Sequence, residues 1–190
     1  MKPQIKTNEL VIRLVAMTII TFCLPLETVT AQTASYSQFK QHNKAGLSIS
    51  LPKEFSKLTE KKQSNEKGTL VTYTAVHETR SLLIKHFQWS PDMQFTTAQA
   101  ADIQEGDMKN QPRYSSSRKE VTINGIRCLI LVMKCEPTMQ QTRVKVSQTI
   151  LYFNKGGHMW EVQIFGVNEL DQGSLGSMTN KIFKSVKIVN

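Results

Sequence analysis

The residues that could carry out chemistry in this chain do not form a known reaction signature. Of the four histidines, His77 and His86 belong to neighbouring predicted strands that are joined by a turn at Thr79-Arg80. In that hairpin the two side chains would lie roughly 13 Å apart, which is too far to share a metal ion. No Cys or His pair has zinc spacing. We therefore expect no metal site and no cofactor.

Nucleophiles and acid pairs are equally hard to assign. The segment 173–176 lacks the Gly-x-Ser-x-Gly pattern of a serine nucleophile. The glycine-rich segment 154–157 lacks the Gly-Lys-Ser/Thr ending of a phosphate-binding loop. Asp102, Glu105 and Asp107 fall on the surface of a predicted helix. We therefore expect no catalytic residues. An enzyme whose site is assembled from residues distant in the sequence is kept as a third hypothesis, behind the two kinds of binding protein named below.

The first 31 residues predict where the protein works. A basic start is followed by an apolar run over 14–26, and Val29-Thr30-Ala31 places small residues where a signal peptidase cleaves. This is the pattern of a cleaved secretory signal peptide over residues 1–31. We expect an exported protein, periplasmic or secreted, of bacterial type. After cleavage it would not span a membrane, because no later segment is apolar enough.

The charge of the chain leaves two kinds of partner open. The whole chain carries +9 and the predicted signal accounts for +1, so the mature part carries +8. Such an excess favours anionic partners such as lipid head groups or acidic glycans, although scattered solubilising lysines would give the same total. Nucleic acid is not expected, because basic and aromatic residues do not interleave.

Cys128 and Cys135 are the cysteines of the mature part. An oxidising compartment favours a disulfide. However, the two residues are seven apart on one predicted strand, so they would point to opposite faces and lie more than about 20 Å apart. We expect two buried free thiols.

The order of predicted elements indicates one domain over residues 45–190, after a flexible linker over 32–44. Residues 53–68 form a charged loop. Helices begin at Thr96 or Thr97, where Gln99 completes a capping box, and at Asn168 or Asp171. Strands are expected over 46–51, 69–77, 82–89, 114–123, 126–135, 144–153, 158–166 and 185–189.

These elements predict an α+β fold, a mainly antiparallel sheet built from hairpins with helices packed on its faces as an α/β/α sandwich. Asn124-Gly125 is a strong signal for a type I′ hairpin turn. The strand 126–135 is apolar on both faces, so we expect it at the centre of the sheet with both faces covered.

A three-residue loop at 154–156 would set the register of the last hairpin. It brings the apolar positions of 144–153 and 158–166 onto one face and leaves polar side chains on the other. That polar face is the candidate interaction surface, and its residues are Arg143, Lys145, Gln163 and Glu161.

Three segments carry a resemblance to a known superfamily. They are Gly46–Pro52, the hairpins around Asn124-Gly125 and Gly156-Gly157 with Trp160 following, and Ile182–Ile188. Over residues 45–189 the chain resembles the PsbP-like superfamily, which also contains the Ran-release factor and the DcrB-like proteins. The resemblance implies a binding module or assembly factor. The leading expectation is a non-catalytic accessory module that docks an envelope protein, and the alternative is a protein that binds anionic lipid or glycan.

Overall fold

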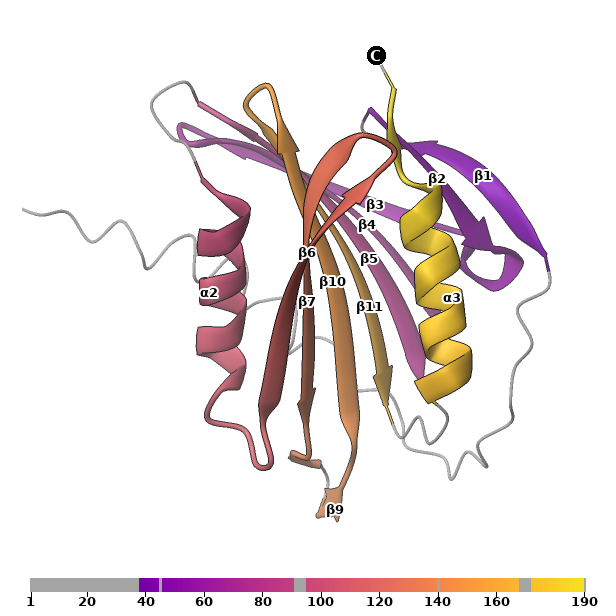
Figure 1. The fold of residues 1–190 in the computed structure, drawn as a ribbon, viewed down its shortest axis with the longest axis vertical. Helices are drawn as coiled ribbons and strands as arrows, with labels where there is room; N and C mark the ends of the chain where they lie inside the picture. The colour runs from indigo at the N-terminus through magenta and orange to yellow at the C-terminus, as the bar shows by residue number, and fades with distance from the viewer. Residues whose placement is uncertain (1–37, 45, 91–94, 140, 168–171, 190) are drawn as a thin grey trace, which may run out of the picture.

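A seven-stranded antiparallel sheet forms the largest part of the protein (Figure 1). The structure is a computed structural model that describes residues 38–44, 46–90, 95–139, 141–167 and 172–189. In spatial order its strands are β3 (Thr59–Asn65), β4 (Gly68–His77), β5 (Arg80–Trp89), β11 (His158–Val167), β10 (Val146–Lys155), β7 (Ile126–Cys135) and β6 (Ser115–Ile123).

One face of the sheet is covered by α2 (Thr97–Met108), which packs on β7 and β10. Ala101 and Met108 of the helix join a buried apolar cluster with residues of the two strands. The predicted capping box is confirmed, because the Thr96 hydroxyl accepts from the Gln99 amide and the Gln99 side chain accepts from the Thr96 amide.

The opposite face is covered in part by α3 (Gln172–Ser185) and by a second sheet of three strands. These strands are β1 (Phe39–Lys44), β2 (Leu47–Pro52) and β12 (Lys187–Ile188). Apolar residues of β2 and α3 form the larger core with β4, β5, β10 and β11. The short elements are η1 (Lys53–Phe55), β8 (Thr138–Met139) and β9 (Thr142–Arg143).

The prediction of an α/β/α sandwich with helices packed on the faces of the sheet is wrong. The described residues are mostly strand, and the large sheet dominates the fold. A single helix lies against each face within the described ranges, and on one side the three-stranded sheet shares the covering role. The sequence pattern assigned the layer on this face to helices alone, but part of that layer is a second sheet.

Three strands differ from the sequence expectation. Residues 39–44, expected in the linker, form β1 against β2. Residues 59–65, expected in a charged loop, form β3, a fully exposed edge strand that needs no apolar face. The strand β7 lies next to the edge of the sheet and not at its centre. The predicted starts of the last helix, Asn168 and Asp171, and the predicted signal peptide lie outside the described residues.

The register of the last hairpin also differs from the prediction. Lys155 pairs with His158, and the turn consists of Gly156 and Gly157, which have φ of 58° and 79°. A loop over 154–156 would pair Phe153 with Gly157, so the observed two-residue turn shifts the pairing by three residues. A shift by an odd number of residues exchanges the faces of a strand, and Tyr152 lies opposite Glu161 and Phe153 opposite Trp160.

The two cysteines behave as predicted. Both are free and buried, and they belong to the two different apolar clusters on opposite faces of the sheet. Burial raises the pKa of the Cys128 thiol to about 11 and also raises the pKa of the Cys135 thiol. Neither is therefore an activated nucleophile at neutral pH.

Candidate functional site

A groove runs along the face of β7 and β10 that lies opposite α2. Ile130, Val132 and Lys134 share this face, because side chains alternate along a strand. Across the ladder, Val132 pairs with Thr149 and Lys134 pairs with Ser147. Ile130 and Val132 are only partly buried. The strand thus carries apolar residues that the protein itself does not fully cover.

The helix α3 forms one wall of the groove. Gly176, Thr179, Asn180 and Phe183 line it at spacings of three and four residues, which places them on one stripe of the helix. Together with the strand residues they enclose a hollow of about 230 Å³. Gly176 lines this hollow, and a Cβ at that position would meet no atom within 4 Å, so there is open space beside it.

The Thr179 hydroxyl is a polar group without a partner in this wall. Thr179 is 6% exposed, and its Oγ1 makes no hydrogen bond in the part of the chain that the structure describes. Buried hydroxyls in native proteins nearly always have a partner. An atom of a bound molecule in the groove would supply one.

The turn between β6 and β7 lies at the other end of α3. Asn124 Nδ2 donates to the carbonyl oxygens of Lys184, at 3.0 Å, and Val186, at 2.8 Å. Asn124 has φ of 49° and is followed by Gly125 with φ of 79°, as predicted for a type I′ turn. In Figure 1 the tip of this hairpin lies beside the C-terminal end of α3, where the two hydrogen bonds from Asn124 hold it.

A second hollow of about 250 Å³, which we call the cationic mouth, lies beside the first and shares Lys134 and Ser147 with it. Its lining also includes Cys135 and Val146, which belong to the apolar cluster on the α2 side. Lys145 and Arg113 add further positive charge, and Glu136 is the acidic residue of its lining. Glu136 is paired with Arg113 at 2.9 Å. We call the two hollows together the α3 groove.

The candidate interaction surface of the sequence analysis is not one surface. Arg143 and Lys145 are exposed near the start of β10, and Lys145 lines the cationic mouth. Glu161 and Gln163 are buried, at 3% and 6% exposure, because the two-residue turn directs them towards the face that α2 covers. A role for these four residues in binding stays a prediction, and the structure does not bring them together.

Glu161 and Gln163 belong instead to a buried polar layer. Lys85 Nζ donates to Glu161 Oε1 at 2.9 Å, Gln163 donates to the same oxygen, and Gln148 donates to Gln163 at 2.9 Å. Burial, followed by the nearby Glu161 charge, raises the pKa of Tyr152 well above its usual value. Each of the four side chains makes at least one hydrogen bond within the layer and so links β5, β10 and β11, whereas the Tyr152 hydroxyl beside it is buried without a partner among the described residues.

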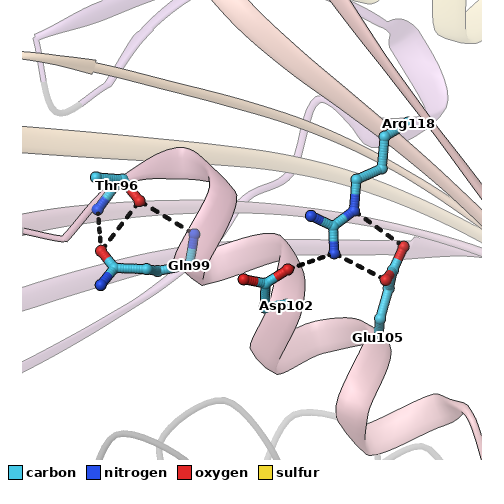
Figure 2. Close-up of polar contacts among 5 residues, drawn as sticks. All are labelled: Thr96, Gln99, Asp102, Glu105 and Arg118. Carbon is cyan, nitrogen blue, oxygen red and sulfur yellow. Dashed lines mark hydrogen bonds and ion pairs between the residues drawn. The ribbon is translucent and has the colours of Figure 1, made fainter.

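The helix α2 is fastened over this face by an arginine of the edge strand. Figure 2 shows Arg118 of β6 reaching two carboxylates of the helix. Its Nη2 lies 2.7 Å from Asp102 Oδ1 and 2.8 Å from Glu105 Oε2, and its Nε lies 3.1 Å from Glu105 Oε1. The hydrogen bond from Arg118 is the main cause of a lowered pKa of Glu105. The predicted acidic helix surface is therefore an anchoring site.

Two histidines that sequence spacing did not connect lie in contact. His86 Nε2 and His158 Nδ1 are 2.9 Å apart, and both rings stack near Trp160. Burial, followed by the His158 charge, lowers the pKa of His86 to about 4. His77 lies elsewhere, beside Phe55. Within the described residues no group of three or more His, Cys, Asp or Glu could hold a metal ion.

The groove itself was missed at the sequence level, although one signal pointed to it. The strand 126–135 is apolar on both faces, which predicted a covering layer on each side. The structure supplies full cover on one face only. A doubly apolar strand next to the edge of a sheet is the pattern that could have indicated a binding groove.

Comparisons with known proteins show distant likenesses in structure. LpqN of Mycobacterium tuberculosis, described as involved in cell envelope biogenesis, is 15% identical with a TM-score of 0.47, covering 80% of this chain and 91% of its own. A Pseudomonas aeruginosa protein of unknown function is 10% identical with a TM-score of 0.36, covering 76% and 90%. A Bacteroides thetaiotaomicron protein is 13% identical with a TM-score of 0.43, covering 81% of this chain and 50% of its own.

No family model and no curated protein matches the sequence. The resemblance to the PsbP-like superfamily therefore stays a prediction. No helix in the described ranges is long and apolar enough to cross a membrane.

Proposed function

We propose that this protein is an exported, non-catalytic binding module whose α3 groove takes a ligand with a negatively charged group. The observation that carries the proposal is the charge of the mouth. Lys134 and Lys145 line it, and the other two charged residues of its lining, Arg113 and Glu136, form an ion pair whose charges cancel. Positive charge gathered at a concave site attracts an anion and fixes its orientation.

Export and the lack of catalysis rest on the sequence. The pattern of residues 1–31 supports a signal peptide, and no motif of the chain matches a reaction signature. In such a compartment the molecules that carry accessible negative charge include phospholipids and acidic glycans.

An envelope protein is the other partner that the sequence analysis considered. Its predicted contact residues are divided between an exposed pair and a buried pair, so they offer no shared docking surface. The groove has concavity, charge and an unpartnered hydroxyl. These features favour a ligand that enters the protein over a partner that docks on a flat face.

The test compares residues 32–190 with two charge variants that change net charge equally. Lys134→Glu with Lys145→Glu alters the mouth, and Lys61→Glu with Lys62→Glu alters the exposed edge strand β3. Sedimentation with phosphatidylglycerol vesicles, phosphatidylcholine vesicles and heparin beads distinguishes lipid from glycan. We expect the mouth variant alone to lose binding to one anionic probe. Equal loss in both variants, or equal binding to the neutral vesicles, would refute the proposal.

A further inference from the structure

We infer that the ligand of the α3 groove is a single-chain anionic lipid, whose head group sits at the cationic mouth and whose alkyl chain lies on β7 against α3. This inference rests on the proposed function and names the ligand class of the same site. It follows from how the lining changes along the groove.

The lining changes from charged to apolar in one direction. Lys134 and Ser147 form a cross-strand pair at the mouth, and Val132 and Thr149 form the next pair on the same face. Ile130 follows two residues further along β7, with Phe183 on the wall. A molecule that matches this order has an anionic head, a polar linker and an alkyl tail.

The middle of the groove offers hydroxyls to the linker. Ser147, Thr149 and Thr179 line this part, and the Thr179 hydroxyl is buried without a partner. An ester or hydroxyl oxygen of a lipid backbone would satisfy it. A purely apolar ligand would leave it unpaired, which is unfavourable.

The far end suits the end of an alkyl chain. Asn124 holds the β6–β7 turn against the end of α3 through two hydrogen bonds. Ile123 and Ile126, which flank that turn, pack against the larger core. Ile130 and Phe183 supply the apolar lining near this end, and Lys119, the cross-strand partner of Ile130, is an exposed charged residue beside it.

The size of the groove limits the ligand to one chain. Its two connected hollows measure about 230 and 250 Å³. Small-molecule sites usually span about 300–1,000 Å³. Each hollow is smaller than that range, which favours a ligand with one alkyl chain and a small head group over one with two parallel chains.

Isothermal titration of residues 32–190 separates the head from the tail. The probes are dodecyl phosphate below its critical micelle concentration, inorganic phosphate as the head alone, and dodecyl maltoside as the tail with a neutral head. We expect only dodecyl phosphate to bind strongly. From hexyl to decyl phosphate, affinity should rise about three- to fourfold for each methylene that becomes buried.

Two glycine variants provide the matched structural test. Gly176→Phe should fill the groove, because a Cβ there meets open space between α3 and β7. Gly106→Phe places the same side chain at an equally open position on α2, away from the groove. We expect Gly176→Phe to reduce dodecyl phosphate affinity at least tenfold and Gly106→Phe to leave it unchanged, with circular dichroism confirming that both variants fold.

Failure of the inference and failure of the proposed function give different results. If affinity is independent of chain length while Lys134→Glu abolishes binding, the site binds anions and the lipid tail is wrong. If no probe binds, or binding ignores Lys134→Glu, the proposed function fails as well. The chain-length series uses the unaltered protein, so it decides the question even where a variant does not fold.

Discussion

Lys85 and Glu161 form an ion pair of 2.9 Å inside the sheet, where their side chains are 2% and 4% exposed. The two residues face each other on adjacent strands, β5 and β11. Charges at such depth are tolerated only when they are paired and hydrogen bonded. The register of β5 and β11 places Glu161 opposite Lys85, and the Gly156-Gly157 turn places Glu161 on the same face as Tyr152 of β10.

Removal of one member of this pair should destabilise the protein strongly. We expect Lys85→Met and Glu161→Leu each to lower the free energy of unfolding by about 3–5 kcal/mol, since each leaves a buried charge unpaired. The double variant should be clearly more stable than the sum of the two losses predicts. Urea unfolding measures the free energy of unfolding of the two single variants and the double variant. Additive losses would show that the two side chains do not interact energetically.

The Arg118 anchor should contribute more than an ordinary surface ion pair. Arg118→Met removes the contacts to Asp102 and Glu105, and we expect the free energy of unfolding to fall by about 1–2 kcal/mol. Arg127→Met is the control, because the Arg127–Glu120 pair is highly exposed on both sides, so its removal should change the free energy of unfolding much less than removal of Arg118.

The pH dependence of the same variant has a definite sign. The folded-state pKa of Glu105 is lowered, so its contribution is complete above the unfolded pKa and is lost as the pH falls through the folded pKa. Arg118→Met should therefore differ most from the unaltered protein at neutral pH and converge with it in acid. A constant difference between the two proteins would contradict the anchoring role.

Acid should also weaken the protein through His86. The folded-state pKa is about 4 and the usual value 6.5, so the unfolded chain binds the proton first as the pH falls. Stability is complete above about pH 6.5 and decreases down to about pH 4. The shift corresponds to about 3 kcal/mol for a fully shielded group and to about half of that for this partly exposed ring.

Replacement of His86 tests this assignment. His86→Phe keeps an aromatic ring beside Trp160 and removes the titrating group. We expect the loss of stability between pH 6.5 and pH 4 to become smaller by about 1–2 kcal/mol. His42, whose pKa is lowered chiefly by burial, should retain its own smaller part of the slope. An unchanged pH profile would exclude His86 as its main source.

The hairpin at Gly156-Gly157 explains where sequence reasoning succeeds and where it stops. Asn124-Gly125 identifies its turn because two residues with positive φ leave one choice of loop. In Asn154-Lys155-Gly156-Gly157 two loops satisfy the local chemistry, one over 154–156 and one over 156–157, and the pairings they give differ by three residues, an odd number that exchanges the faces. Glu161 was assigned to the surface for this reason. Strand positions follow from local pattern, whereas register depends on which of two similar turns forms.

Which element packs on each strand also depends on residues that are distant in the sequence. The doubly apolar pattern of 126–135 predicted a strand, which is confirmed, and a central place, which is wrong. What covers Ile130 and Val132 depends on where α3 lies, and α3 is separated from them by more than 40 residues of chain. Contacts set by long-range packing could not be derived from spacing, and they include the whole α3 groove.

Asn124 has two roles at the end of α3: it adopts a positive φ in the turn, and it donates two hydrogen bonds to the end of the helix. Three substitutions separate these roles. Asn124→Gly keeps the positive φ but removes the bonds to Lys184 and Val186, so we expect a loss of about 1–2 kcal/mol. Asn124→Asp keeps the side-chain size but places an acceptor against two carbonyl oxygens, and should lose more. Asn124→Ala loses both the hydrogen bonds and the tolerated φ. Amide hydrogen exchange in residues 182–186 should accelerate in all three variants, and least in Asn124→Gly. If all three variants were as stable as the unaltered protein, the hydrogen bonds from Asn124 would not hold the end of α3.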